Sequence, residues 1–459
     1  MKNVINLGIA TILVLLTAGV QAKVSEEEAK RLETDLTPLG AERAGNADGS
    51  IPAWTGSMTD APEGLNYGGD GTQLPDAYAD EKPLHTVTTA NIAEHTQFLT
   101  QGQQALLKKY PDTFKMNVYP THRDGGYSEK VTGQARFNVT NTMLSDNGEG
   151  ATGWTGGPAF PIPQSALEVM WNTRGFVYAT SDGHYDNVAV FANGTKTEET
   201  SWIRSAFPAA YPSHKVGDTE AEIGKDLFYT LAVLVAPAAE KGKMNLVHDP
   251  VDYVTNKRNA WTYIPGTRRV RQAPSLGFDT PIGPGGLITA DDAEGFNGSF
   301  TARYDWVLKG KSEIYVPAHN YKFDDQSLDY KDLLTVGHAN PEYMRYEKHR
   351  VWVVEATLKS GERHLYAKRV FYIDEDHWNV VAADVYDGRG ELFRAVMQNS
   401  VYHYAIHGYQ RRAALYHDLV SGHYLARNVI NQQEAPKLTG EPWGEQFFSP
   451  SNLRRMGRR

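Results

Sequence analysis

The chain of 459 residues contains no cysteine. This absence excludes disulfide bonds, a thiol nucleophile, iron–sulfur clusters and zinc sites built on thiolates. It also excludes a lipid anchor attached to cysteine. The fold must therefore be held by its buried core, without covalent cross-links.

Long hydrophobic runs are also scarce. After the first 22 residues the longest run spans residues 227–236, and Pro237 ends it. A helix needs roughly 20 apolar residues to cross a bilayer. This run therefore predicts a buried strand or a short core helix, and no membrane span.

Positive charge is not in excess. The chain has 46 Lys and Arg against 55 Asp and Glu, which gives a formal net charge of -9. Proteins that bind nucleic acid usually carry a basic surface, because the phosphate backbone dominates their affinity. We therefore expect no nucleic-acid partner.

The first 22 residues match the pattern of a secretory signal peptide. Lys2 gives a basic start, residues 7–16 are apolar, and Val20-Gln21-Ala22 places small residues where a signal peptidase cleaves. The apolar stretch is shorter than a membrane span, which argues against a retained anchor. We expect cleavage after residue 22 and a mature protein in the periplasm, either free or peripheral to the outer membrane.

Aromatic residues, glycine and proline are plentiful: 25 Tyr, 16 Phe, 9 Trp, 42 Gly and 23 Pro. This composition predicts many short strands and turns rather than a helical bundle. The clearest pattern lies toward the C-terminus, where short turns separate four strand-like segments. Short turns join antiparallel neighbours, so the pattern predicts an antiparallel meander. The segments are residues 351–359, 365–373, 378–386 and 392–402.

Local signals assign the other elements. Helices are expected at 23–45, where Ser25 can act as the cap, at 89–110 and at 165–175. Residues 46–85 are expected to be extended but ordered, and the tail from residue 431 irregular. Strands are expected within 114–141 and on either side of turns at Ser181-Asp182-Gly183, Pro265-Gly266 and Lys309-Gly310-Lys311.

Four longer stretches carry a resemblance to a known family. They are GNADGSIPAW at 45–54, WTYIPGTRRVR at 261–271, YDW followed by KGK within 304–311, and RYEKHRVWVVEA at 345–356. With these motifs the chain resembles the DUF1329 family of Gram-negative bacteria over nearly its whole mature length.

The resemblance implies a fold and a setting. DUF1329 is similar to the LolA/LolB-like outer-membrane lipoprotein-sorting fold, in which a half-open antiparallel β-barrel holds an apolar cavity under helices. It also implies an RND-type permease and a DUF1302-type outer-membrane protein as partners. It implies no reaction, since the family has no settled biochemical activity.

Pattern and resemblance together predict an α+β fold. It is a large curved antiparallel sheet, a LolA-like half-open β-barrel, with helices on its concave side and long ordered N-terminal segments. Residues 23–459 are expected to form a single domain. A subdivision near residue 220, between an N-terminal part of helices and loops and a C-terminal meander, stays open.

Several clusters have the composition of metal ligands. Asp374-Glu375-Asp376-His377, Asp291-Asp292 and Asp324-Asp325 offer oxygens, and His403 and His407 are four residues apart. Turns and helix caps account for the acidic groups, and the two histidines lack a third ligand. The sequence has no calcium-loop, zincin, serine-hydrolase or phosphate-loop motif. We therefore expect no metal, no cofactor and no catalytic residue.

Aromatic residues and arginines in the predicted strands form the candidate binding site. One interpretation is a cavity lined by aromatic rings, with arginines near its mouth, for an amphiphile with an apolar body and an anionic head. The alternative is a packed aromatic core beside a solvated strand edge. The candidate ligand-binding residues are Trp261, Tyr263, Arg269, Arg271, Tyr304, Trp306, Trp352, Tyr366, Tyr372 and Trp378.

These observations favour a periplasmic carrier or accessory protein that holds a lipid-like or hydrophobic molecule. It would work with a permease and an outer-membrane partner, and binding and release would need a lid movement. A scaffold with a packed core that bridges envelope partners is the first alternative. A hydrolase acting on amphiphilic substrates is the second.

Overall fold

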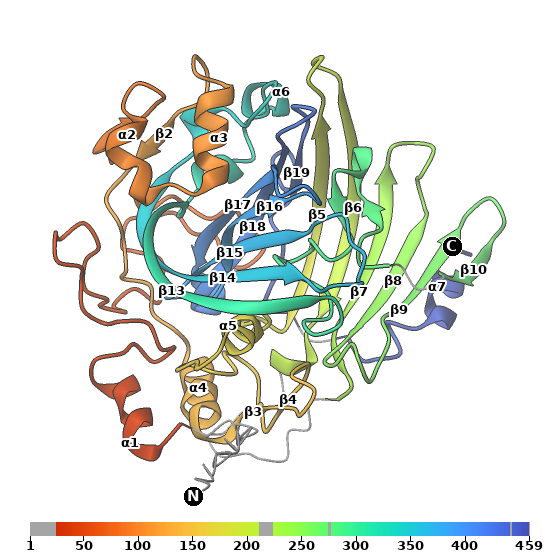
Figure 1. Cartoon of the computed structure of the whole chain (residues 1–459). Coiled ribbons are helices and arrows are strands. Elements are labelled where there is room, and N and C mark those ends of the chain that lie inside the picture. Colours follow the sequence, from red (N-terminus) through yellow and green to blue (C-terminus); the bar gives the residue numbers. More distant parts are fainter. Residues whose placement is uncertain (1–23, 211–223, 274–276, 441–442, 459) are drawn as a thin grey trace, which may run out of the picture.

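The computed structural model describes residues 24–210, 224–273, 277–440 and 443–458. Its main feature is a single 15-stranded sheet that takes strands from both halves of the chain (Figure 1). The predicted signal peptide lies outside the described residues. In the described part of the chain, no helix has the length and apolar character needed to cross a bilayer.

The sheet runs in the order β13, β14, β15, β16, β17, β18, β19, β5, β6, β7, β8, β9, β10, with every neighbour antiparallel. The short strands β1 (His85–Val87) and β2 (Met116–Val118) extend it beyond β14, where β2 pairs in parallel. The long strands are β5 (Thr180–Val190), β6 (Lys196–Ala206), β7 (Asp226–Ala236), β8 (Met244–Pro250), β9 (Asn259–Ile264), β10 (Arg269–Gln272), β13 (Tyr304–Pro317), β14 (Tyr346–Leu358), β15 (Lys368–Asp374), β16 (Val380–Tyr386), β17 (Leu392–His403), β18 (Gly408–Asp418) and β19 (Tyr424–Val429).

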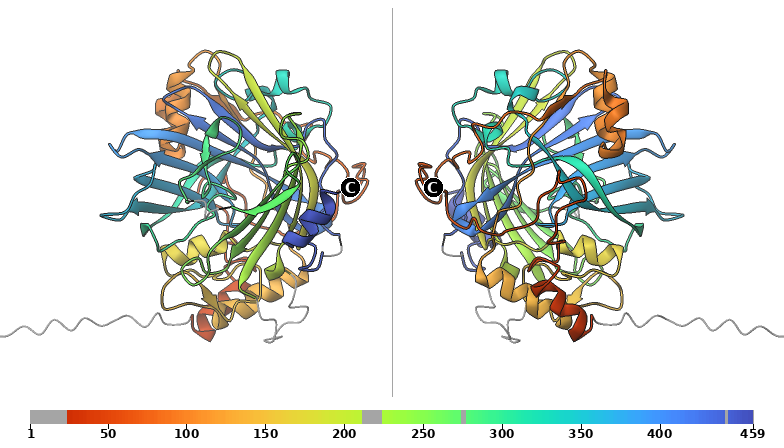
Figure 2. Two further views of the ribbon diagram at one scale, coloured as in Figure 1. Left: turned by 90° about the vertical axis from the view of Figure 1, so that its right-hand side faces the viewer. Right: turned by 90° about the vertical axis from the view of Figure 1, so that its left-hand side faces the viewer.

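Nearly all neighbours in this order follow each other along the chain. The exception is β19, which pairs with β5 and so joins the two halves of the chain into one sheet. Figure 2 shows the result as two facing walls, one built from β5–β9 and the other from β14–β18. The sheet is curved and not closed into a barrel, because β10 and β13 do not pair with each other. The predicted fold class is confirmed.

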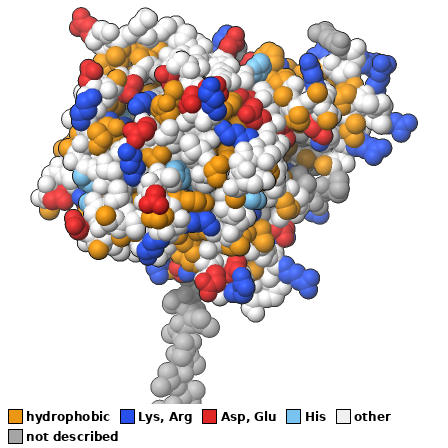
Figure 3. Space-filling view, turned by 90° about the horizontal axis from the view of Figure 1, so that it is seen from above, with side chains coloured by type: hydrophobic (Ala, Val, Ile, Leu, Met, Phe, Trp, Pro, Cys, Tyr) orange, Lys and Arg blue, Asp and Glu red, His pale blue; other side chains and the backbone are white. Residues whose placement is uncertain are grey.

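The free end at β10 is covered on one face by the C-terminal segment. Helix α7 (Pro450–Met456) and Phe448 pack on Tyr263 of β9, in a cluster that also contains Leu231 and Leu246. The sequence pattern missed α7, which Ser449 caps. Viewed from above, Lys and Arg side chains gather at this end of the molecule (Figure 3).

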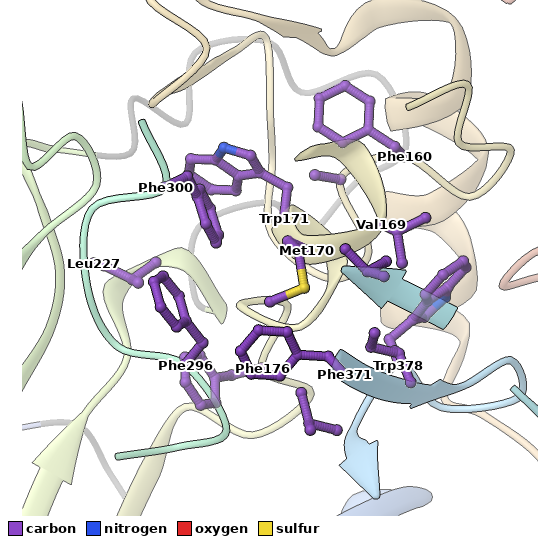
Figure 4. Close-up of a cluster of buried hydrophobic side chains, with 14 of the residues drawn as sticks. Phe160, Val169, Met170, Trp171, Phe176, Leu227, Phe296, Phe300, Phe371 and Trp378 are labelled. Atoms are coloured by element: carbon purple, nitrogen blue, oxygen red, sulfur yellow. The ribbon is translucent and has the colours of Figure 1, made fainter. Parts of the chain in front are cut away.

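The concave side is partly filled by a large hydrophobic cluster. Helix α5 (Ala166–Asn172), predicted from the sequence, places Met170 and Trp171 among aromatic side chains from both walls (Figure 4). Phe228 of β7 and Phe371 of β15 belong to the same cluster, so the two walls meet here through their side chains. Helix α4 (Glu129–Asn141) adds Val131 and Ala135.

Helix α3 (Gln101–Lys109) lies on the other face of the sheet. It packs on Ala395 and Met397 of β17, which alternate with Val396 on the concave side. The approach is close, because a Cβ on Gly102 would come within 2.6 Å of the Ala395 Cβ. The prediction that helices lie on the concave side therefore holds for α4 and α5 but not for α3.

Helix boundaries follow their caps. Ser25 accepts the Glu28 N–H and begins α1 (Glu26–Ala29), as predicted, but regular helix ends at residue 33 instead of 45. The helix expected at 89–110 is divided into α2 (Ile92–His95), a 3-10 turn and α3, since Thr100 and Gln103 form a capping box that starts a new helix. The remaining short helix, α6 (Tyr330–Leu333), belongs to the connection between β13 and β14.

Three strand predictions are wrong. Residues 129–141 are α4, capped by Ser128, so only β2 remains of the two strands expected at 114–141. The expected turn at 181–183 lies inside β5, and the chain reverses at residues 192–195. The expected hairpin at 309–311 is a bulge in the continuous strand β13, where Gly310 has a φ of 102°.

Candidate ligand cavity

The curved sheet encloses a cavity of about 240 Å³ beside the filled region. Strand periodicity determines which side chains reach it. Ile203 of β6, Thr230 of β7 and Val247 of β8 face the cavity, whereas Leu231 and Leu246 face the C-terminal segment on the outside. Strands β18 and β19 contribute the opposite side of the lining.

A connecting segment, residues 277–303, closes part of the cavity. It lies between β10 and β13, which are at opposite ends of the sheet order, so the chain crosses the concave side here. Ile282, Ala290 and Glu294 of this segment line the cavity. The Tyr416 hydroxyl of β18 donates to the Asp292 carbonyl at 3.0 Å and ties the segment to the sheet.

Two of the four arginines that line the cavity are engaged in short ion pairs. Arg258 Nε lies 2.5 Å from Asp249 Oδ1, and Arg412 Nε lies 2.6 Å from Asp324 Oδ2. These two guanidinium groups are therefore neutralised by their own carboxylates and fixed in place.

The other two arginines share a single carboxylate. Arg427 lies 3.4 Å and Arg411 lies 3.8 Å from the half-buried Glu294 side chain, and Arg411 Nη1 also donates to the Glu294 carbonyl at 2.6 Å. Burial alone would raise the pKa of Glu294, but Arg427 and Arg411 outweigh it and lower that pKa, so the carboxylate stays ionised. Four arginines thus face three carboxylates, and one positive charge is in excess at this end of the cavity.

The backbone at Glu294 is unusual. Its φ is 55°, in the left-handed region that residues other than glycine rarely adopt, and Gly295 follows with a φ of 87°. A Cβ on Gly295 would lie 2.8 Å from the Val380 side chain, so only glycine allows this approach to β16. The ion pair with Arg411 and Arg427 is therefore made from a constrained position of the connecting segment.

The cavity lining combines apolar side chains with hydrogen-bonded serines and paired arginines. No histidine is among the described residues that line the cavity, and its serines are hydrogen-bonded to Tyr185 and Thr230. An apolar lining with an excess of one positive charge can hold an anion attached to an apolar body.

None of the ten site residues predicted from the sequence is among the residues that line this cavity. They lie in two places. Six lie in the other wall or next to it. Tyr304 and Trp306 belong to the aromatic cluster around Phe371, and Trp352 stacks on Trp378 with ring centroids 6.3 Å apart. The hydroxyl of Tyr366 donates to Asp292, and that of Tyr372 donates to Asp384.

The four hairpin residues lie at the free end of the sheet. Trp261 packs against His248, and the Tyr263 hydroxyl donates to the Gly457 carbonyl at 2.7 Å, so both contact the outer layer. Arg269 and Arg271 of β10 are exposed. By register Arg271 pairs with Thr262, and Thr262 bonds to Asn245 on the cavity-facing side of β8. As ligand contacts, the ten residues stay a prediction.

The acidic residues at 374–376, which resembled metal ligands, are buried and paired with cationic side chains. In the predicted turn, Asp374 contacts His349 at 2.6 Å, Glu375 contacts Arg350 at 2.7 Å, and Asp376 contacts Arg123 at 2.7 Å. Among the residues that the structure describes, no group of three or more such side chains is arranged to hold a metal ion.

Comparisons with known proteins place the chain in a family. A family model described as "Protein of unknown function (DUF1329)" matches residues 86–454. The uncharacterized protein PA3922 of Pseudomonas aeruginosa is 38% identical over 457 residues, which cover 97% of this chain and 96% of the relative.

Solved structures with similarity include two whose names match the sequence-based resemblance. A DUF1329 family protein from Desulfovibrio piger is 15% identical, with 60% of this chain and 92% of that chain covered and a TM-score of 0.40. A LolA superfamily protein from Nitrosomonas europaea is 12% identical, with 62% and 98% covered and a TM-score of 0.37. On the family model and the Pseudomonas relative, the chain belongs to the DUF1329 family.

Proposed function

We propose that the protein is a periplasmic carrier or accessory protein that binds an amphiphile with an anionic head and an apolar body. The observation that supports this most directly is the cavity between the walls, where Arg411 and Arg427 share only Glu294. A carboxylate or phosphate monoanion at these guanidinium groups would match the excess charge.

The apolar part of the lining would receive the body of the ligand. Burying about 200 Å² of apolar ligand surface contributes roughly 5 kcal/mol, and a hydrogen bond to a charged group adds about 1.5–3 kcal/mol. These terms support reversible binding of the kind that a carrier needs.

The cavity volume limits what fits without movement. At about 240 Å³ it is smaller than typical small-molecule pockets of roughly 300–1,000 Å³. It has room for a head group and the first part of a chain, and a full lipid would require the connecting segment 277–303 to move outward. The carrier proposal therefore includes displacement of that segment.

The setting in the cell is part of the proposal. The signal-peptide pattern at residues 1–22 supports export to the periplasm, and family resemblance supports work alongside an RND-type permease and a DUF1302-type outer-membrane protein. The proposal assigns the protein a role in handing over a ligand, with no bond made or broken.

The test is binding of dodecanoate to delipidated protein by calorimetry. Wild type is expected to bind dodecanoate saturably and to bind dodecyltrimethylammonium, which has the same chain and the opposite charge, at least tenfold more weakly. Arg427→Gln should lose about tenfold in affinity for dodecanoate, and Arg427→Lys should recover part of it.

Arg389→Gln serves as the matched control, because Arg389 is an exposed turn residue. Circular dichroism and thermal unfolding should show that all variants are folded. If wild type binds no lipid-like anion saturably, the carrier proposal fails. If Arg427→Gln binds as tightly as wild type, the cavity is not the head-group site.

A further inference from the structure

A second feature of the molecule, away from the cavity, is an exposed cluster of arginines at the free end of the sheet. Three come from the β9–β10 hairpin, two from helix α7, and one from position 458, just after that helix. All six are exposed in a chain whose formal net charge is -9. We call this cluster the arginine edge. It consists of Arg268, Arg269, Arg271, Arg454, Arg455 and Arg458.

The fold holds these two segments together. Helix α7 contacts β10, and Leu453 packs in the same cluster as Tyr263 and Val270. Gly457 makes the close approach possible, because a Cβ there would lie 2.1 Å from the ring of Tyr263. The juxtaposition is therefore built into the packing of the C-terminus and is not a consequence of one flexible tail.

The arginine edge lacks internal counter-ions. In the described part of the chain none of the six arginines forms an ion pair, and Arg455 bonds only to the uncharged Asn452 side chain. Buried arginines elsewhere, such as Arg369 and Arg412, have carboxylates at 2.7 and 2.6 Å. Six like charges at one edge repel each other, and an anionic partner would relieve that repulsion.

Acidic residues gather elsewhere on the molecule. Glu26, Glu27, Glu28 and Glu33 lie in and just after α1, at the opposite side of the molecule from β10 and α7 (Figure 1). Figure 3 shows several positive side chains at the β10 end, while others are scattered among acidic ones over the rest of this face. This separation of charge would orient the protein, with the arginine edge first, toward a negatively charged surface.

The neighbouring residues favour a bilayer over an acidic protein or a nucleic acid. Trp443 and Phe447 are half-buried beside α7 and stack on each other with centroids 5.3 Å apart. Aromatic rings next to basic side chains are typical of the membrane–water interface. The arginines stand on both sides of the sheet's free end, Arg269 and Arg271 on β10 and Arg454 and Arg455 on the helix that packs on its outer face.

We propose that the arginine edge docks the protein on a bilayer surface that carries anionic head groups. The contact is electrostatic and reversible, since it depends on exposed side chains that salt can screen. It also presents β10, the last strand of the wall that lines the cavity, to the membrane. The proposal does not depend on the cavity binding a ligand.

The test is co-flotation of the full protein with phosphatidylcholine vesicles that contain or lack phosphatidylglycerol. Wild type is expected to bind the anionic vesicles at least tenfold more tightly than the neutral ones at low ionic strength. Binding should weaken severalfold at roughly 0.15 M salt, where the Debye length falls to about 8 Å.

Two edge variants test the assignment. One double variant combines Arg269→Gln with Arg271→Gln, and the other combines Arg454→Gln with Arg458→Gln. Each should lose at least threefold in affinity for anionic vesicles. The quadruple variant, which carries all four substitutions, should lose at least tenfold. Arg136→Gln with Arg389→Gln is the matched control, because it removes two exposed arginines outside the edge. All these positions are exposed, so each variant should retain the circular dichroism spectrum of wild type.

Equal binding to neutral and anionic vesicles would overturn the proposal. So would binding of the quadruple variant to anionic vesicles as tightly as wild type. A parallel measurement uses polyglutamate and a DNA duplex in place of vesicles. Suppose that wild type binds polyglutamate or DNA, that the quadruple variant does not, and that neither binds vesicles. This result would overturn the bilayer assignment and identify that class of partner instead.

Discussion

Glu294 occupies the position at which an anionic head group would meet Arg411 and Arg427. Its carboxylate is held at 3.4–3.8 Å, whereas the carboxylates of Asp249 and Asp324 lie within 2.6 Å of their arginines. Each guanidinium has five N–H donors, so this long contact leaves donors available to a second anion. Glu294 and a ligand would then compete for the same two arginines.

Replacing Glu294 with glutamine should strengthen the binding of anionic amphiphiles. The change removes the competing charge but keeps the size of the side chain, and it leaves two uncompensated arginines at the cavity. Glu294→Gln is expected to bind dodecanoate about tenfold more tightly than wild type, which corresponds to about 1.4 kcal/mol. Calorimetry on wild type and variant checks this.

Glu391→Gln, at an exposed turn, is the control and should leave the affinity unchanged. Weaker or equal binding by Glu294→Gln would contradict competition at this position. The cavity could still be the binding site in that case, because the Arg427 variant tests it separately.

At the residue scale, the arginines predicted from the sequence and the arginines that line the cavity are different residues. An arginine-bearing cavity was expected, but Arg269 and Arg271 are exposed at the sheet edge, while Arg411 and Arg427 line the cavity. Alternation along a strand shows which residues share a face. It does not show which face becomes the inside, and that depends on strands far apart in the sequence.

At the scale of elements, Arg123 and Arg350 of β14 hold an N-terminal segment without regular structure against the sheet, because both donate to its carbonyls. Arg123 donates to both oxygens of Asp376 at 2.7 Å and to the carbonyls of Glu42 at 2.7 Å, Ala44 at 3.3 Å and Pro52 at 3.1 Å. Residues 46–85 were predicted to be extended but ordered, whereas residues 42 and 44 lie in the range expected to be helical. These hydrogen bonds explain the order, because the carbonyls of an extended chain need donors from elsewhere.

Arg123→Met should destabilise the protein and release this segment. The variant leaves Asp376 buried without the guanidinium of Arg123, whereas Glu375 keeps Arg350 and Lys311. Breaking a buried pair in this way costs about 3–5 kcal/mol. Urea unfolding should show the loss. Limited proteolysis should show new cleavage between residues 42 and 60.

Arg363→Met, at an exposed loop position, provides the comparison and should match wild type in both assays. Unchanged urea stability of Arg123→Met, or a wild-type digestion pattern, would mean that the segment is held by other contacts.

Element prediction worked where a turn is encoded locally. Strands β14 to β17 and the hairpin at Pro265-Gly266 were expected from short polar turns, and all are present. It failed at Lys309-Gly310-Lys311, where the same residue types form a bulge inside β13. A glycine with positive φ serves a turn and a bulge equally well, so only the pairing of β13 with the full length of β14 decides between them.

At the scale of the whole molecule, the architecture depends on the pairing of β19 with β5. These strands are more than 200 residues apart in the chain, and their pairing turns two meanders into one curved sheet with a cavity between its walls. No local signal marks this pairing. The curved fold was expected from family resemblance, whereas the position of the cavity could be found only in the structure.

Three buried histidines give the whole protein a defined pH dependence. Burial lowers the pKa of His403 to about 4 and that of His417 to about 3. Burial also opposes a charge on His349, but Asp374 outweighs it and raises the pKa of His349 to about 10. The first two histidines fold in the neutral form and the third folds in the charged form.

These shifts predict a stability maximum near pH 6.5, the pKa of histidine in an unfolded chain. Below this pH the unfolded chain takes up protons at His403 and His417 that the folded protein does not bind, and each proton costs about 1.4 kcal/mol per pH unit. Above it the folded protein keeps the proton of His349 that the unfolded chain loses, so stability declines by about 1.4 kcal/mol per unit as the pH rises toward 10.

Carboxylates extend the acid side of this profile. Burial opposes the ionised form of Glu347, but His319 outweighs it and lowers the pKa of Glu347. In the same way, His377 and His349 outweigh burial at Asp374 and lower its pKa. Their contribution is complete above the unfolded pKa of about 4 and is lost as the pH falls below it. Acid should therefore destabilise the protein more steeply than base.

Urea unfolding midpoints across this pH range measure the profile. His403→Gln should make the slope between about pH 6.5 and pH 5 shallower by about 1.4 kcal/mol per pH unit, because one proton that only the unfolded chain binds no longer contributes. His184→Gln is the control, because His184 is only half-buried, and should leave the slope unchanged. A midpoint that is constant or rises between pH 6.5 and 5 would show that these histidines are protonated or solvated in the folded protein.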